Sequence, residues 1–285
     1  MKKYFCILTL IAFIAVSFSG CGSKPAAGPS NDVSKDLRGD GLAVLCYHRV
    51  MPANLLKIER NLDPMESELA YYTIDKDKFI SQLKYLKNNN VKFLTPKEAD
   101  EYLSKKQAFS GKLALVTLDD GDLSIYKQAY PVLVKMKIPF ILFMIAGEAD
   151  KQWEGFHMCS WDQLKKMEAS GYCTVGLHTY DMHYIDAATN KPALLNKENK
   201  KRFEKDTKEG IASLKKHLGT GTVYYAYPYG FGNPDTDNIL LSNGINDIFS
   251  LSSKINHPGD KKFFIGRYLV TEDNWNKIAA WVKQK

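Results

Sequence analysis

Residues 113–121 have the sequence LALVTLDDG, in which six residues suited to a β-strand are followed directly by Asp119, Asp120 and Gly121. A continuous run of apolar and β-branched residues predicts a strand that is buried on both faces, as in a parallel sheet. Two carboxylates directly after such a strand are costly unless a cation neutralises them. The stretch therefore predicts a strand that ends at a polar site, and a solvated turn is the simpler alternative.

Seven further runs of this kind alternate with amphipathic segments. The alternation predicts parallel β-α units with both sheet faces covered. Seven or eight units predict a single-domain α/β fold, a distorted (β/α) barrel, with a doubly wound open sheet as the competing architecture. The predicted strands are 42–46, 91–94, 113–118, 140–145, 173–177, 223–227, 247–251 and 267–270, and the predicted helices are 77–88, 96–104, 124–136, 161–170, 197–218, 234–242 and 272–283.

The composition excludes several classes of protein. With 45% hydrophobic and 25% charged residues among 285, the chain is not disordered throughout. One long apolar run does not make a polytopic membrane protein. The formal net charge of +7 is dispersed among acidic residues, so no nucleic-acid partner is expected. Five cysteines in a chain of this length do not form a disulfide framework.

The N-terminus has the pattern of a secretory signal. Lys2 and Lys3 precede an apolar stretch at 4–16 that is shorter than the roughly 20 residues needed to cross a bilayer. The following Ser-Gly-Cys21 resembles the lipobox of bacterial lipoproteins, in which the peptide is cut before the cysteine and the cysteine is acylated. An uncleaved anchor helix is the alternative. We expect a signal peptide at 1–20, a flexible tether at 21–40, a folded domain at 41–285, and an extracytoplasmic, lipid-anchored protein.

Two other predicted strands end in histidine-containing segments. His178 follows the strand at 173–177, His183 lies five residues further on, and His48 follows the strand at 42–46. In parallel β-α folds the carboxyl ends of the strands meet on one face, where function is found. We therefore expect these histidines to face the two aspartates, although isolated histidine pairs are more often incidental.

Asp120, His178 and His183 would supply one carboxylate and two imidazoles, which suit Zn²⁺ and similar divalent metals. Three protein ligands leave a position open for water or substrate, as in catalytic metal sites. Such a metal lowers the pKa of its bound water to about 7 and polarises a carbonyl oxygen. Asp119 would then be free to act as a base, and His48 as an acid.

These segments resemble the polysaccharide deacetylases of carbohydrate esterase family four, which have a NodB-homology domain. The residues Thr117-Leu118-Asp119-Asp120-Gly121 are similar to the first motif of that family, T-F-D-D-G. The histidine spacing of five differs from the usual four and is the spacing found in the poly-β-1,6-N-acetylglucosamine deacetylases of biofilm systems. Tyr227-Pro228-Tyr229-Gly230 is similar to the third motif, with Ala226 where an arginine is usual. Leu45-Cys46-Tyr47-His48 matches the early Y-H segment of the biofilm subgroup.

The resemblance implies a role for each matching residue. Asp119 would be the general base, and His48 the acid that protonates the departing nitrogen. Asp120, His178 and His183 would hold the metal, with zinc expected and nickel, cobalt or manganese as alternatives, and no organic cofactor is implied. The backbone N–H of Tyr229 would stabilise the oxyanion. Pro228 and Tyr180 are further candidates for substrate contact, and Arg267 is a candidate for orienting Asp119.

The implied reaction is hydrolysis of N-acetyl groups on a cell-surface polysaccharide, with poly-β-1,6-N-acetylglucosamine as the expected substrate. Peptidoglycan or chitin-like oligomers are rival substrates. An O-acetyl esterase and a non-catalytic glycan-binding lipoprotein are rival functions. Trp153, Phe156 and Trp161 are candidates for a sugar-stacking platform, and local packing is the equal alternative for these rings.

Overall fold

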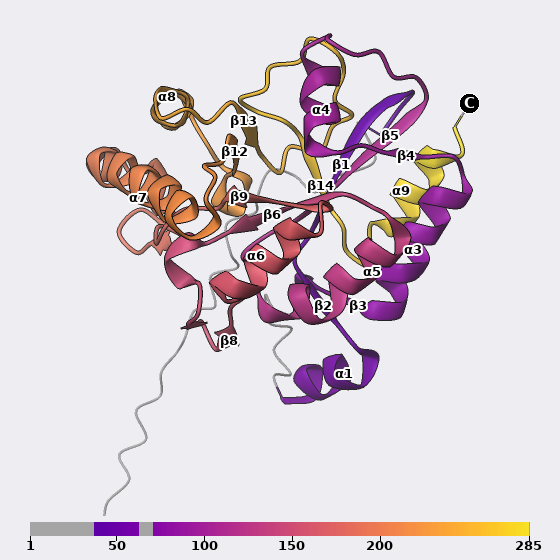
Figure 1. Cartoon of the computed structure of the whole chain (residues 1–285), viewed down its shortest axis with the longest axis horizontal. Helices are drawn as coiled ribbons and strands as arrows, with labels where there is room; N and C mark the ends of the chain where they lie inside the picture. Colours follow the sequence, from indigo (N-terminus) through magenta and orange to yellow (C-terminus); the bar gives the residue numbers. More distant parts are fainter. Residues whose placement is uncertain (1–36, 63–70, 285) are drawn as a thin grey trace, which may run out of the picture.

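The computed structural model describes residues 37–62 and 71–284. At its centre lies a parallel sheet in the order β13-β12-β9-β6-β5-β1-β14, with β4 paired to the amino-terminal half of β5 (Figure 1). Each predicted strand is present, with ends that differ by at most two residues. The strands of this sheet are β1 (Gly41–Tyr47), β4 (Lys92–Phe93), β5 (Lys112–Leu118), β6 (Phe140–Met144), β9 (Cys173–Leu177), β12 (Tyr224–Ala226), β13 (Asp247–Phe249) and β14 (Arg267–Leu269).

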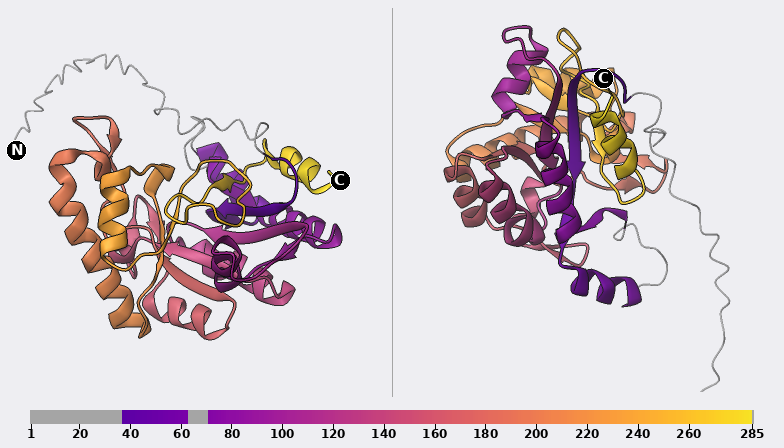
Figure 2. Two further views of the ribbon diagram at one scale, coloured as in Figure 1. Left: turned by 90° about the horizontal axis from the view of Figure 1, so that it is seen from above. Right: turned by 90° about the vertical axis from the view of Figure 1, so that its right-hand side faces the viewer.

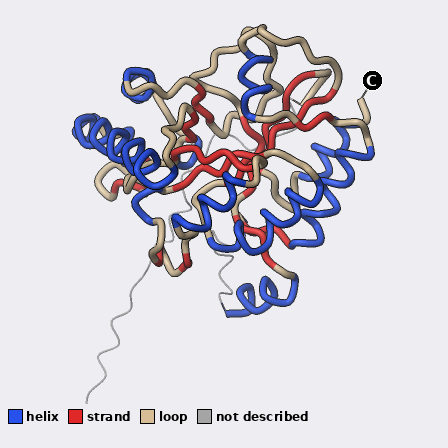
Figure 3. Tube along the Cα trace, in the orientation of Figure 1, coloured by secondary structure: helices blue, strands red, loops and turns tan. Residues whose placement is uncertain are grey.

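The sheet closes almost completely into a barrel. Phe249 of β13 forms a parallel bridge with Ile265, whose chain continues into β14, and β14 pairs with β1. Backbone bonds support this seam, because Ile265 donates to Ile248 (2.8 Å) and Ser250 donates to Ile265 (2.9 Å). Figure 3 shows the strands gathered at the centre with the helices outside them. The predicted distorted barrel is confirmed, and the open sheet is excluded.

Helices surround the sheet (Figure 2). Capping boxes at Thr95 and Ser160 begin two of the helices, and Gly219 ends another in the left-handed conformation. The helix expected over 124–136 is divided, because Pro131 has no N–H to donate; a π-helical turn (Ile125–Ala129) precedes α5. The α-helices are α1 (Ala53–Leu62), α3 (Lys76–Asn88), α4 (Pro96–Leu103), α5 (Tyr130–Met136), α6 (Trp161–Ala169), α7 (Lys200–Leu218), α8 (Pro234–Ser242) and α9 (Trp275–Val282).

Several short elements were not expected from the sequence. Helix α1 lies beside two three-residue strands, β2 and β3, at the lower edge of the molecule in Figure 1. Strands this short carry too few residues to show a period of two. These strands are β2 (Arg49–Met51), β3 (Thr73–Asp75), β7 (Gln152–Trp153), β8 (Phe156–His157), β10 (Ile185–Asp186) and β11 (Lys191–Pro192), and the 3-10 turns are Ala146–Glu148, Ala193–Leu195, Lys197–Asn199 and Pro228–Gly230.

Residue alternation along the strands places a polar layer on top of an apolar barrel interior. Leu113 and Leu115 of β5 belong to the smaller apolar cluster inside the barrel. Side chains of helix α4 complete this cluster. Continuing with a period of two, Thr117 and Asp119 face the same interior. Arg267 of β14 is fully buried against this layer. The carboxyl ends of the strands therefore hold buried polar groups where the apolar filling ends.

The folded part begins earlier than residue 41. Leu37 is buried, and the side chain of Gln284 donates to its carbonyl (3.0 Å). The indole of Trp281 donates to the carbonyl of Gly39 (2.9 Å). These bonds attach 37–40 to the last helix, so this part of the expected tether belongs to the domain. Residues 1–36, with the predicted signal peptide and Cys21, lie outside the described residues. Within 37–62 and 71–284, no helix has the length and hydropathy of a membrane span.

Candidate active site

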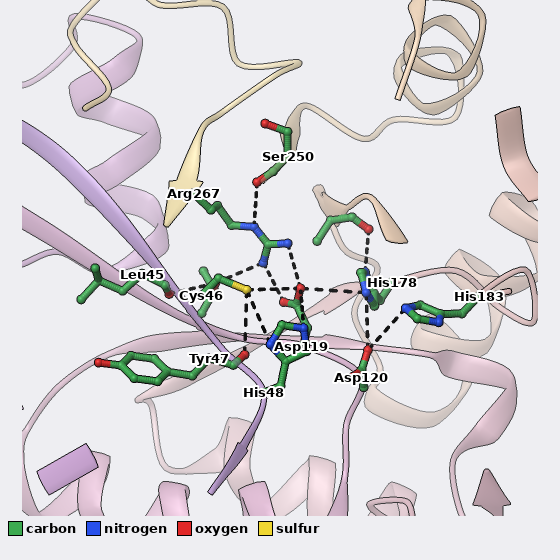
Figure 4. Close-up of polar contacts among 12 residues, drawn as sticks. Leu45, Cys46, Tyr47, His48, Asp119, Asp120, His178, His183, Ser250 and Arg267 are labelled. Carbon is green, nitrogen blue, oxygen red and sulfur yellow. Dashed lines mark hydrogen bonds and ion pairs between the residues drawn. The ribbon is translucent and has the colours of Figure 1, made fainter. Parts of the chain in front are cut away.

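Asp119 and Arg267 form a buried ion pair at the top of the barrel (Figure 4). The guanidinium donates to both carboxylate oxygens, with Nη1–Oδ1 at 2.7 Å and Nη2–Oδ2 at 2.8 Å. Burial raises the pKa of Asp119, but the charge and hydrogen bonds of Arg267, together with His178 and His48, hold that pKa well below its usual range. Arg267 also donates to Thr117 (3.2 Å) and to the carbonyl of Ser250 (3.1 Å). Asp119 is therefore ionised and fixed in one orientation.

Asp120, His178 and His183 converge on one point beside that pair. The Nε2 atoms of His178 and His183 each lie 3.5 Å from Oδ1 of Asp120. The three candidate ligand atoms lie within 4.8 Å of one another. Two ligands of one tetrahedral zinc ion, bound at about 2.0–2.2 Å, stand about 3.3–3.5 Å apart. The spacing of these side chains therefore fits a bound divalent ion.

The electrostatics of this cluster also favour a cation. Nδ1 of His178 lies 2.7 Å from the carbonyl oxygen of Ala226, which can only accept, so Nδ1 carries the proton. Burial lowers the pKa values of both histidines, so both imidazoles are neutral, and Nε2 of His178 presents a lone pair toward Asp120. Oδ1 of Asp120 is buried and accepts no hydrogen bond from the described residues. A divalent ion held by Asp120, His178 and His183 would satisfy this oxygen together with the imidazole nitrogens.

A second candidate ligand group, formed by Cys46, His48 and Asp119, fits a cation less well. Both oxygens of Asp119 already accept from Arg267, so the guanidinium takes the place of a metal ion. Burial raises the pKa of Cys46, which keeps its thiol protonated as a donor to Oδ2 of Asp119 (3.5 Å). Residues Asp120, His178 and His183 are therefore the better candidates to hold a metal.

His48 lies on the other side of Asp119, with its Nε2 4.0 Å from Oδ2 of the carboxylate. The ring of Tyr72 packs against the imidazole, with ring centroids 4.7 Å apart. Burial lowers the pKa of His48 to about 4, and the charge of Asp119 offsets this only in part. The imidazole is therefore neutral near pH 7 and available to accept a proton.

The turn after β5 has a backbone conformation that few residue types adopt. Asp120 adopts a left-handed conformation with φ of 71°, and Gly121 follows with φ of 94°. A Cβ atom on Gly121 would lie 2.0 Å from the sulfur of Met144. Glycine is thus required at 121, and the turn directs Asp119 and Asp120 toward different partners of one site.

A cavity of about 240 Å³ opens onto these groups. It brings together most of the residues predicted from the sequence, including Tyr229, whose ring lies 4.9 Å from that of His183. Pro228 and Tyr180 do not line it, and Tyr180 instead packs against the core. The lining residues are His48, Arg49, Tyr72, Asp119, Asp120, Asp122, Trp153, Glu154, Phe156, Met158, His178, His183 and Tyr229.

The candidate aromatic platform is divided by the structure. Trp153 and Phe156 lie in the β7–β8 hairpin and line the cavity, and Trp153 packs edge-on against His183 at 5.2 Å. Trp161 lies elsewhere, stacked on His217 at 4.3 Å. Trp161 therefore takes part in local packing, whereas Trp153 and Phe156 lie in the cavity wall.

The sequence did not identify Arg49 and Tyr72 as parts of the site. Arg49 stacks over the ring of Phe156 at 4.1 Å, and its Nε lies 3.8 Å from Asp122. Its position directly after His48 was an available signal. Tyr72 precedes a three-residue strand and had no such signal. Asp122, Glu154 and Met158 also line the cavity without having been predicted.

Comparison with known proteins agrees with this geometry. A family model described as polysaccharide deacetylase matches residues 106–248. The chain is 32% identical to a poly-beta-1,6-N-acetyl-D-glucosamine N-deacetylase of Staphylococcus aureus (strain MSSA476), over 98% of this chain and 97% of that protein. It is 31% identical to the protein of the same name from Staphylococcus epidermidis, over 99% and 98% of the two chains. The solved structure of IcaB from Ammonifex degensii superposes with a TM-score of 0.79 at 51% identity, covering 86% of this chain and 98% of that one.

Proposed function

The chain belongs to the polysaccharide deacetylase family, and from that premise we propose that it removes N-acetyl groups from poly-β-1,6-N-acetylglucosamine. The enzyme is then a hydrolase of N-acetyl amides. The observation that carries the proposal is the convergence of Asp120, His178 and His183 beside an ionised Asp119 at the base of a cavity. The substrate is taken from the names of relatives that match almost the whole chain.

The residues around the cavity supply the groups that amide hydrolysis needs. Asp119 takes a proton from the attacking water, whose oxygen bonds to the acetyl carbon. Arg267 holds the carboxylate with both oxygens fixed, so the base stays in one position. The backbone N–H of Tyr229 is assigned to the oxyanion, consistent with the place of this residue in the cavity wall. A divalent ion held by Asp120, His178 and His183 would supply Lewis acidity toward the acetyl carbonyl.

His48 is assigned to the second half of the reaction. The C–N bond breaks with its electron pair on nitrogen, which must gain a proton to leave as the free amine, while acetate is released. Because His48 is neutral at rest, it must first receive the proton that it donates. Asp119, which has just gained one from water, lies 4.0 Å away. The pair can therefore return that proton to the leaving group.

The size and walls of the cavity suit one sugar of a long polymer. Its volume of about 240 Å³ is below the roughly 300–1,000 Å³ of pockets that enclose a whole ligand. The rings of Tyr72, Trp153 and Tyr229 offer apolar faces, and sugar rings stack on such faces. We infer that one N-acetylglucosamine unit enters while the rest of the chain lies outside.

Acetate release tests the function directly. The protein is incubated with β-1,6-linked N-acetylglucosamine oligomers and, in parallel, with peptidoglycan and chitin-like oligomers. We expect acetate from the β-1,6-linked oligomers, abolished by a chelator and restored by Zn²⁺. Acetate from peptidoglycan alone would overturn the substrate, and no acetate from any acetylated glycan would overturn the activity.

We propose zinc as the resident metal, because two imidazoles and one carboxylate suit it. Imidazole also suits nickel, whereas cobalt and manganese stand lower in the general order of affinity. Metal analysis of protein purified without added metal, by mass spectrometry, would give about one zinc per chain. A different metal at that stoichiometry would contradict zinc while leaving the ligand set intact.

We also propose that Cys21 is acylated and holds the enzyme at the outer face of the bacterial membrane. The support is the sequence alone: a basic start, an apolar stretch and Ser-Gly before the cysteine. Acylation with more than one chain gives stable anchoring. In a bacterial host, the full chain should partition with membranes, and Cys21→Ala should lose the lipid-modified N-terminal peptide in mass spectra. An unmodified Cys21 in the membrane fraction would contradict the anchor.

A further inference from the structure

The loop that carries both histidines has a backbone under strain. Thr179, between the strand end and His183, has φ of 86°. A β-branched residue in this left-handed region is a genuine outlier and is kept only where surrounding contacts determine it. Since the loop fixes where His178 and His183 meet, those contacts bear on the candidate metal site.

One side of the loop is held by the backbone after β6. The N–H of Ala146 donates to the carbonyl of Thr179 (3.0 Å), and the N–H of Gly147 donates to the carbonyl of Tyr180 (2.8 Å). A Cβ atom on Gly147 would lie 2.5 Å from that Tyr180 oxygen, so the approach requires glycine. The carbonyl groups of the loop are thereby satisfied on this side.

The other side is held by a carboxylate from α7. Asp206 is 2% exposed, and its two oxygens accept from consecutive backbone N–H groups of the loop. Oδ1 accepts from Tyr180 (2.9 Å) and Oδ2 from Asp181 (2.7 Å). One turn earlier on the same helix, Arg202 lies 3.6 Å from the side chain of Asp181. A single face of α7 therefore contacts the loop between the two histidines.

We propose that Asp206 is a positioning residue for metal binding, which sets the affinity of the His178–His183 loop for its ion without touching the ion. The inference rests on the proposed function only in that this loop binds the metal. Each oxygen of Asp206 holds one backbone N–H group of the loop by a direct hydrogen bond. Changes to groups that hold the ligands of a metal commonly cost 10–100-fold in affinity.

A carboxylate is required because both of its oxygens accept. Asparagine has nearly the same shape, but it offers one oxygen and one NH₂ group. In Asp206→Asn, one of the two loop N–H groups would therefore face another donor inside the protein. The strained conformation at Thr179 would lose one of the contacts that determine it, and the histidines would be less well placed before the ion arrives.

The test measures Zn²⁺ binding to the full chain by calorimetry. We expect Asp206→Asn to weaken Zn²⁺ affinity 10–100-fold. Glu209→Gln is the matched control, because this exposed acid lies on the same helix and pairs only with Lys205 in the contacts seen (3.5 Å). It should bind Zn²⁺ as the wild type does. A Co²⁺-loaded sample provides a second signal, since its visible spectrum should change in Asp206→Asn and not in Glu209→Gln.

His183→Ala separates this inference from the proposed function. If His183→Ala loses Zn²⁺ binding while a folded Asp206→Asn keeps wild-type affinity, the role of Asp206 is overturned and the metal site stands. If His183→Ala binds Zn²⁺ as tightly as the wild type, the metal site itself is wrong, and the inference fails with it.

Hydrogen exchange on the wild type covers the case in which Asp206→Asn does not fold. The amides of Tyr180 and Asp181 should be protected in the metal-free protein, because they donate to the buried carboxylate. Exchange of both amides at the rate of an unstructured chain would overturn the proposal without any variant.

Discussion

At the scale of single residues, the site depends on how buried charges are compensated. Asp119 is ionised in an apolar setting because Arg267 meets both of its oxygens. Asp120, one residue further, has no such partner among the described residues, and burial together with Asp119 raises its pKa. The two adjacent carboxylates thus differ in charge compensation. Arg267 neutralises Asp119, whereas no cationic side chain among the described residues neutralises Asp120 in this way. This difference assigns one to proton transfer and the other to metal binding.

Asp119→Asn should bind Zn²⁺ and lose activity. The amide keeps the shape of the side chain but cannot take a proton, and loss of a general base commonly costs 10²–10⁴-fold. Acetate release and zinc stoichiometry, measured on one sample, check the two halves of this expectation. Near-full turnover would remove Asp119 from the role of base.

The same variant should also be less stable, because Arg267 would stay buried without its anion. Removing one partner of a buried ion pair costs about 3–5 kcal/mol.

His48→Ala is the companion variant: it should slow turnover with zinc content and stability near the wild type. Loss of zinc from His48→Ala would make His48 a ligand instead.

At the scale of elements, the amino end of one strand carries a buried carboxyl group that pairs with a lysine. Asp247 begins β13, is 2% exposed, and lies 3.3 Å from Nζ of Lys262. Burial raises the pKa of Asp247 to about 6, and Lys262 offsets this only in part. The pKa of Asp247 is thus raised at a position that does not line the candidate site. The effect of this pKa on folding can therefore be measured separately from catalysis.

Asp247 should make folding depend on pH. Its pKa is raised in the folded state, so the folded chain holds a proton that the unfolded chain releases above about pH 4. The resulting stability is present below that pH and is lost as the pH rises through about 6. Relative to Asp247→Asn, the wild type should lose up to about 3 kcal/mol across this range. Urea unfolding of both proteins between about pH 4 and pH 7 measures the change, and a constant difference would contradict it.

Local sequence determined most elements, and the exceptions have local causes. Strands β1 and β5 are buried at every position, and a continuous apolar run is what such strands require. The helix expected over 124–136 is divided at a proline. The hairpin of β7 and β8 carries Trp153 and Phe156, which line the cavity. Its strands have two residues each, too few for an alternation of apolar and polar residues to be visible in the sequence.

At the scale of the whole molecule, the two ends of the barrel have separate roles. The candidate site occupies the carboxyl ends of the strands, where parallel β-α folds place their chemistry. At the other end, α9 covers the start of β1: Trp281 is fully buried, and its indole donates to Gly39. Lys112 at the start of β5 bonds to the same carbonyl (3.0 Å). We therefore expect stability and metal binding to respond to different residues.

Trp281→Ala should lower the free energy of unfolding by about 3–5 kcal/mol, the usual cost of removing a buried tryptophan side chain. Trp281→Phe is the matched variant, and it should lose less because the ring still fills the space and only the bond to Gly39 is lost. Urea unfolding measures both. Zn²⁺ affinity of the folded variants should match the wild type, and a large loss of affinity would show that the two ends are coupled.

The sequence by itself determined the order of strands and helices and the strand ends that carry Asp119, Asp120, His178 and His183. These features follow from local periodicity and from motifs within a few residues. Arg267 was a candidate for orienting Asp119 from the sequence, but only the tertiary structure decided that its guanidinium donates to both carboxylate oxygens from 148 residues away. Only the tertiary structure decided that Asp206 holds the histidine loop. It also decided that Tyr72 and Trp153 form walls of one cavity. The reason is physical: these contacts exist only after the barrel closes, and no local pattern specifies which distant side chains then meet.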